Sequence, residues 1–170
     1  NALSVLEGGL QTGAMGMKLW VSCLCDDPRC DALYERCAEE SVPVLIHTFS
    51  KTVGQLSGES TAVHLRRAAL CHPDTTFIMA HLGGNCYHGI PLIRDLGNVY
   101  TDFSGSGSRR DDLPYALEQL GAERILFGTD MPGSFSMSWG QVLSAGLTKR
   151  EKTLICRENA QRLFPALRNI

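Results

Sequence analysis

Short apolar runs and amphipathic helical segments alternate along the chain. The apolar runs, each bounded by turn-forming residues, predict strands at 13–20, 42–46, 76–80, 99–104 and 124–128. Between them, apolar residues recur at helical spacing and predict helices at 2–10, 31–40, 60–71, 89–96, 111–120, 137–146 and 149–164. Because a strand, a loop and a helix recur with a period of about 25 to 30 residues, we predict an α/β fold built on a parallel sheet.

Two aspartates stand where predicted helices begin. Asp31 and Asp111 precede the apolar spacing of their helices, and a carboxylate there can accept hydrogen bonds from free backbone N–H groups. We therefore expect both residues to cap the helices that follow them.

Five predicted strands are too few for a closed barrel. A (β/α)8 barrel needs eight strands and typically about 250 residues, whereas this chain has 170. An open five-stranded sheet is the alternative, but it would leave two apolar edges with unpaired backbone groups, which proteins avoid or cover. The pattern favours an incomplete barrel.

Three of the apolar strands end in a side chain capable of metal binding or proton transfer. These side chains are His47, His81 and Asp130, which follow the second, third and fifth predicted strands. An unpaired carboxylate beside a buried strand costs several kcal/mol, so Asp130 must be paired, hydrogen-bonded or bound to a metal. Active sites lie at the carboxyl ends of parallel strands, and we expect these three groups to converge there.

The composition and net charge of the chain limit the kinds of molecule that it is expected to bind. A hydrophobic content of 44% supports a buried core, and a net charge of -2 with a pI of 6.2 gives no electrostatic footprint for nucleic acid or an anionic membrane. No apolar run reaches the roughly 18 residues of a membrane span, and the first residues do not resemble a signal peptide. We expect a cytoplasmic protein, although a chain that starts with Asn can have lost a targeting segment.

Seven cysteines follow no disulfide framework, which fits reduced thiols. Four of them cluster in the sequence, at Cys23, Cys25, Cys30 and Cys37. A structural zinc site there lacks the usual paired spacing, so ordinary buried or loop thiols are favoured over it.

Five sequence pieces in fixed order resemble a known family. They are Pro43 to His47, Ala80 to Gly84, Asn98 to Ser104, Arg124 to Pro132 and Glu158 to Phe164. Together they resemble the amidohydrolase-related metal-dependent hydrolases, in the branch that includes aminocarboxymuconate semialdehyde decarboxylase. The resemblance implies that residues 1–170 are the C-terminal portion of a single TIM-barrel domain, with strands four to eight and their helices.

The resemblance also implies roles for the polar strand ends. His47 and Asp130 would be metal ligands, and His81 and Asp130 would be the catalytic proton-transfer groups. The implied cofactor is a divalent metal, with Zn²⁺ preferred and Mn²⁺ or Fe²⁺ as alternatives. The family's first strand carries a His-x-His pair, which this chain lacks, so we expect weak metal binding and little catalysis from the chain alone.

Several other side chains are candidates for substrate binding, each with a structural alternative. They are Lys18, which can also snorkel to solvent, His88 in a glycine-rich loop, Ser104, which can also bond its own loop, and Arg109, which can also be solvated.

The leading functional prediction is hydrolysis of an amide, ester or lactone bond through a metal-activated water. Non-oxidative decarboxylation of an aromatic or unsaturated acid is the first alternative, and a non-catalytic half-barrel is the second. The expected partners are a small-molecule substrate and the missing N-terminal strands, with a homo-oligomer left open.

Overall fold

A parallel five-stranded sheet forms the centre of the molecule in a computed structural model, which describes residues 1–105, 109–164 and 166–167. Its strands follow chain order and are β1 (Met17–Leu19), β2 (Val44–Ile46), β3 (Phe77–Met79), β4 (Val99–Asp102) and β5 (Ile125–Leu126). Every neighbouring pair is parallel. The predicted α/β class and the parallel sheet are confirmed, although each strand is shorter than its apolar run.

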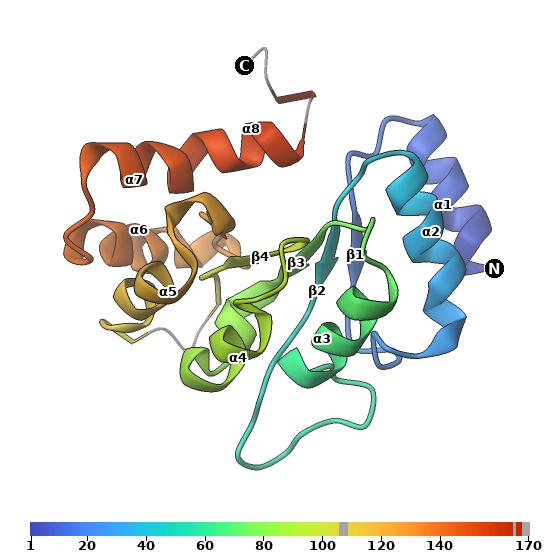
Figure 1. Ribbon diagram of the computed structural model, residues 1–170, viewed down its shortest axis with the longest axis horizontal. Coiled ribbons are helices and arrows are strands. Elements are labelled where there is room, and N and C mark those ends of the chain that lie inside the picture. The colour runs from blue at the N-terminus through green and yellow to red at the C-terminus, as the bar shows by residue number, and fades with distance from the viewer. Residues whose placement is uncertain (106–108, 165, 168–170) are drawn as a thin grey trace.

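Helices connect the strands and pack beside one another around the sheet (Figure 1). They are α1 (Ala2–Gln11), α2 (Asp31–Glu39), α3 (Ala62–Cys71), α4 (Cys86–Ile93), α5 (Asp112–Leu120), α6 (Phe135–Ser144), α7 (Lys149–Thr153) and α8 (Asn159–Leu163). A π-helical turn, Leu154–Glu158, joins α7 to α8, so the predicted helix at 149–164 is one helical segment with a local widening. In the part of the chain that the structure describes, no helix has the length and hydrophobicity needed to cross a bilayer.

The two faces of the sheet differ because alternate strand residues point in opposite directions. Val44, Ile46, Phe77 and Met79 are fully buried in the core that the helices cover. The residues between them, together with Lys18, line an open cavity on the other face. This cavity lies where the interior of a complete barrel would be.

The residues that begin the helices differ in part from expectation. Helix α2 already starts at Asp31, so the predicted cap is wrong, and this carboxylate instead lies 3.0 Å from Nε2 of His72. Asp111 does occupy the position before α5, but its side chain makes no capping hydrogen bond. Helix α3 begins after Thr61 with a capping box. The Thr61 side chain accepts a hydrogen bond from the His64 backbone N–H, and the His64 side chain accepts one from the Thr61 backbone N–H.

An ion pair between Arg66 and Asp95 fixes α3 against the end of α4 and gives a testable pH dependence. The two nitrogens Nη1 and Nη2 lie 2.6 and 2.8 Å from the carboxylate oxygens. These hydrogen bonds lower the pKa of Asp95 from 3.8 to about 2. Because this pKa is depressed on folding, the pair stabilises the fold above pH 4, and its contribution disappears as the pH falls through about 2.

We therefore expect Asp95→Asn to lower the free energy of unfolding near pH 7 and to have progressively less effect as the pH falls from 4 to 2. Urea denaturation over this pH series measures the difference. Asp74→Asn, at an exposed position before β3, is the matched control. An Asp95→Asn effect of equal size at every pH would contradict the assignment.

Candidate active site

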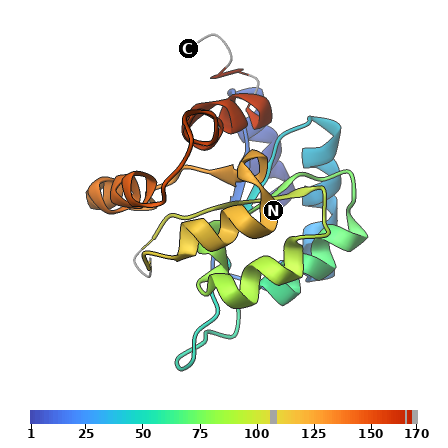
Figure 2. The same ribbon diagram turned by 60° about the vertical axis from the view of Figure 1, so that its left-hand side comes forward.

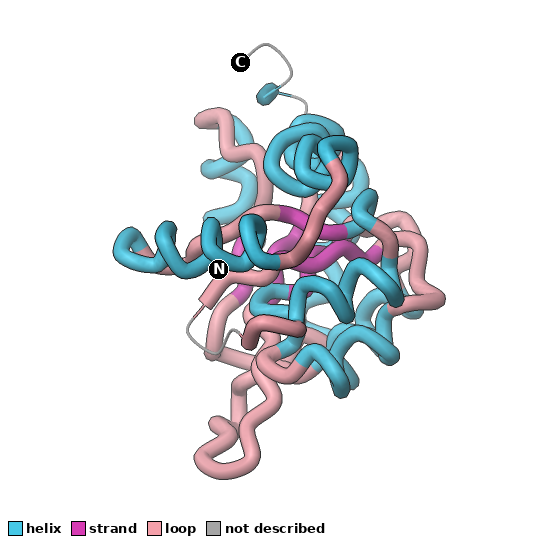
Figure 3. The backbone as a smooth tube through the Cα atoms, turned by 90° about the vertical axis from the view of Figure 1, so that its left-hand side faces the viewer, coloured by secondary structure: helices cyan, strands magenta, loops and turns pink. Residues whose placement is uncertain are grey.

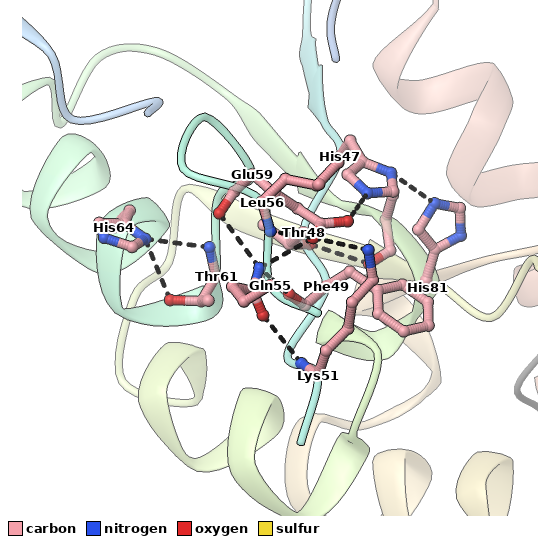
Figure 4. Close-up of polar contacts among 11 residues, drawn as sticks. His47, Thr48, Phe49, Lys51, Gln55, Leu56, Glu59, Thr61, His64 and His81 are labelled. Atoms are coloured by element: carbon pink, nitrogen blue, oxygen red, sulfur yellow. Dashed lines mark hydrogen bonds and ion pairs between the residues drawn. The ribbon is translucent and has the colours of Figure 1, made fainter. Parts of the chain in front are cut away.

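His47, directly after β2, places its ring between an acid and a second imidazole (Figure 4). Its Nε2 lies 3.1 Å from Oε1 of Glu59, and its Nδ1 lies 3.2 Å from Nε2 of His81. Phe49 stacks on the ring with an interplanar angle of 11°. The carboxyl ends of β2 and β3 therefore bring the two predicted histidines into direct contact.

Glu59 is held by more than His47. Its side chain is 3% exposed, and Oε2 accepts hydrogen bonds from Lys51 Nζ at 2.7 Å, Gln55 Nε2 at 3.0 Å and the Leu56 backbone N–H at 3.3 Å. Burial by itself would raise the pKa of Glu59, but the hydrogen bonds from Lys51 and His47 outweigh it and the pKa is lowered. Glu59 is thus a buried carboxylate that stays ionised at neutral pH.

The loop that carries Glu59, residues 47–61, projects beyond the rest of the fold before returning to α3 (Figures 2 and 3). Sequence analysis missed this acid because it stands among polar loop residues, twelve positions after His47, with no strand end or helical spacing to mark it.

The hydrogen bonds along the two rings require one more proton than two neutral imidazoles carry. Glu59 is an acceptor, so the proton on His47 belongs to Nε2. At the other end, Nδ1 of His81 lies 3.1 Å from the Ser104 carbonyl oxygen, which is also only an acceptor, so the proton on His81 belongs to Nδ1. The facing nitrogens, His47 Nδ1 and His81 Nε2, are then both unprotonated. One added proton would form a hydrogen bond between them.

This arrangement makes the histidine pair a proton acceptor. The pKa of His47 is lowered, chiefly by burial, which the hydrogen bond to Glu59 only partly offsets. His47 is therefore neutral near pH 7, and the shared position between the rings is open. A proton taken from water or substrate completes the hydrogen-bonded chain from Glu59 to Ser104, with the negative charge of Glu59 balancing it.

The backbone around His81 is strained to present the ring. His81 and Leu82 have φ angles of 62° and 49°, a left-handed conformation that costs L-residues about 1–3 kcal/mol. The His81 backbone N–H donates to Asp102 Oδ1 at 3.1 Å. Gly105, with φ 99°, allows close approach, because a Cβ there would lie 2.9 Å from His81 Nδ1.

Asp102 and Ser104, at the end of β4, connect the histidine pair to a cavity of about 450 Å³. Ser104 Oγ donates to Asp102 Oδ1 at 2.6 Å and also lies 3.0 Å from His81 Nδ1. Lys18 and Asp130 line the same cavity. Lys18 is exposed as a residue, but partial burial of its amine lowers its pKa, while the charges of Asp102 and Asp130 oppose the shift.

The other sequence-predicted residues have no described hydrogen bond to the histidine pair. Asp130, with φ 66°, borders the cavity but has no described contact with either histidine ring. His88 is exposed on α4, and Arg109 is exposed with its backbone N–H bonded to Asp112. Neither is among the described residues that line the cavity. Their predicted roles in substrate binding remain predictions.

The described residues do not complete a metal site. Within 1–105, 109–164 and 166–167, no three His, Cys, Asp or Glu side chains lie close enough together to hold an ion. His47, the predicted ligand, has both ring nitrogens in contact with protein groups. A metal bound to His47 would have to displace Glu59 or His81 from its ring. The remaining metal-binding groups would have to come from outside the residues that the structure describes.

We expect the purified chain to retain well below one equivalent of zinc after dialysis, because two donors do not form a stable Zn²⁺ site. Elemental analysis of the dialysed protein measures the ratio, with His47→Ala as the comparison. Stoichiometric zinc that disappears in His47→Ala would contradict this expectation.

Comparisons with known proteins agree on the fold. An uncharacterized TIM-barrel protein from Bordetella bronchiseptica is 22% identical, with a TM-score of 0.80 over 98% of this chain and 62% of its own. A dihydroxybenzoic acid decarboxylase from a Polaromonas species, solved with bound manganese and an inhibitor, is 20% identical, with a TM-score of 0.73 over 98% of this chain and 65% of its own.

A putative 2-pyrone-4,6-dicarboxylic acid hydrolase from Pseudomonas putida is 19% identical, with a TM-score of 0.69 over 95% of this chain and 67% of its own. The chain thus spans about two thirds of the length of these TIM barrels, as an incomplete barrel does. No curated protein sequence matches it. The amidohydrolase family model matches residues 11–166, and the chain therefore belongs to the amidohydrolase family.

Proposed function

We propose that the protein of which this chain forms at least a part is a hydrolase that cleaves an amide, ester or lactone bond in a small molecule. The contact between His47 and His81, backed by the buried Glu59, carries this proposal. It supplies a base at the carboxyl ends of adjacent strands, which is what attack by water on an acyl carbon requires.

In this proposal, His81 removes the proton from the attacking water at Nε2, and His47 stabilises the protonated ring through Nδ1. Glu59 balances the new positive charge, and Asp102 fixes the backbone of His81. Asp130 is proposed to accept or return a proton at the cavity. Family enzymes depend on a divalent metal, and we assign the completion of that site to donors outside the described residues.

Decarboxylation is the second candidate, and Lys18 supports it. Lys18 lines the cavity together with Asp102 and Asp130, whose charges act on its amine. In the proposal this amine pairs with the carboxylate of a substrate. The histidine pair would then return its shared proton to the carbon that loses CO2. The similar structures include both a decarboxylase and a putative hydrolase, so the fold does not choose between the reactions.

Product analysis separates the two reactions. The chain, expressed with any residues encoded upstream of Asn1, is incubated with a panel of lactones, amides and aromatic carboxylic acids. The hydrolase proposal expects acid release from a lactone or amide and no CO2. Release of CO2 from an aromatic acid, with lactones and amides untouched, would overturn it in favour of the second candidate.

Lys18→Met is expected to raise KM for a carboxylate-bearing substrate about 10- to 100-fold, because a charge-assisted hydrogen bond is worth about 1.5–3 kcal/mol. Steady-state kinetics measures the change. Lys149→Met, at an exposed position that begins α7, is the control. Equal KM values for both variants would remove Lys18 from the substrate site.

A further inference from the structure

Two of the clustered cysteines lie within reach of each other, and the proposed catalytic chemistry does not use them. Cys23 Sγ and Cys30 Sγ are 3.7 Å apart, in the segment between β1 and α2. No described group of His, Cys, Asp or Glu side chains forms a metal cluster here or elsewhere, so the zinc alternative finds no support. The neighbouring Cys25 is buried, its backbone N–H donates to Ser60 Oγ, and its carbonyl accepts from the Tyr34 hydroxyl.

The two thiols differ in their surroundings in the way that a reactive and a resolving cysteine differ. Cys23 is partly exposed. Cys30 is 2% exposed, and burial, followed by the contact with Cys23, raises its pKa to about 11. An oxidant in solution reaches Cys23 first, and Cys30 is already positioned behind it.

We propose that Cys23 and Cys30 are a peroxide-sensitive dithiol that closes to an intramolecular disulfide. The Cys23 thiol is oxidised by hydrogen peroxide to a sulfenic acid with release of one water. The Cys30 sulfur then attacks the Cys23 sulfur, the S–S bond forms, and the sulfenic hydroxyl leaves with the Cys30 proton as a second water. Two thiols and one peroxide thus give one disulfide and two waters.

The dithiol is coupled by packing to the loop that holds His47. The Cys25 backbone N–H donates to Ser60 Oγ at 2.9 Å. Gly58 lies so close to Ser22 that an added Cβ would be 3.1 Å from its carbonyl carbon and oxygen. Glu59 stands between these two contacts in the sequence. Closing the disulfide restrains the segment of residues 22–25 and, through it, the loop that carries Glu59.

Mass spectrometry tests the disulfide in a Cys71→Ser background, which removes the exposed thiol able to link two chains. After treatment with one equivalent of hydrogen peroxide, we expect the mass to fall by two hydrogens, two titratable thiols to disappear, and a non-reduced digest to link Cys23 to Cys30. Reductant should restore both thiols. Cys23→Ser or Cys30→Ser should abolish the linkage, whereas Cys156→Ser should leave it unchanged.

Hydrogen exchange of residues 50–61 tests the coupling. We expect slower exchange in the oxidised protein than in the reduced protein, and no difference in Cys30→Ser. Peroxide treatment that leaves both thiols titratable, or that adds oxygen to Cys23 without linking it to Cys30, would overturn the disulfide. A disulfide that leaves exchange in this loop unchanged would overturn the coupling.

Discussion

Replacing His81 with glutamine is expected to lower kcat/KM of the whole enzyme about 10²- to 10⁴-fold, the usual contribution of a general acid or base. Glutamine cannot exchange a proton, so the shared position between His47 Nδ1 and the residue-81 side chain is lost as a proton acceptor. The loss should fall mainly on kcat, because the ring acts on the reacting proton rather than on the remainder of the substrate. Initial rates on the substrate identified by product analysis measure it.

The control is Lys149→Gln, which introduces the same amide at an exposed position that begins α7. It should retain nearly full activity. A His81→Gln enzyme within a few fold of the wild type, or equal losses in the two variants, would rule out proton transfer by His81.

Glu59→Ala is expected to lower the free energy of unfolding by about 1–3 kcal/mol, because it leaves partly buried hydrogen-bond donors without their acceptor. His47, Gln55 and the Leu56 backbone N–H each lose a partner. The Lys51 amine, on a side chain that is 32% exposed, can instead turn to water. Urea denaturation at pH 7 measures the change. Since a domain is stable by only about 5–15 kcal/mol, this one substitution removes a large part of the total.

Glu39→Ala is the control, because Glu39 also pairs with a cation but is 68% exposed. Exposed pairs contribute about 0–1 kcal/mol, so a small effect is expected there. Glu59→Gln keeps the shape and part of the hydrogen bonding and should fall between the two. If Glu59→Ala and Glu39→Ala cost the same, Glu59 does not organise a buried network.

The sequence predicted the sheet well because each buried strand is a continuous apolar run between turn residues. Val44 to Ile46 and Phe77 to Met79 were recognisable for this reason, and so were the side chains that follow them. Periodicity was less informative at helix starts. Aspartate is a residue type that often caps helices, which is why Asp31 was predicted to do so. A short 3-10 turn at Pro28–Cys30 directly precedes α2, so Asp31 is already inside the helix.

Only part of the candidate site could be predicted from the sequence, for a physical reason. His47 and His81 are marked by strand ends, but Glu59 reaches His47 through a loop whose path no local pattern fixes. Asp102 closes a predicted strand, where the sequence alone does not distinguish a carboxylate that bonds its own loop from one that reaches a pocket. In the structure it does bond its own loop through Ser104, and by the same carboxylate oxygen it holds the backbone of His81.

The strand order has a consequence for how the chain folds. The five described strands pair in the order in which they occur in the sequence, so no pairing among them has to wait for a distant segment. Contacts between near neighbours along the chain close small loops and form early. The sheet can therefore grow one strand at a time during synthesis on the ribosome, with the histidine pair assembled once β3 has docked on β2 and Asp130 brought in last.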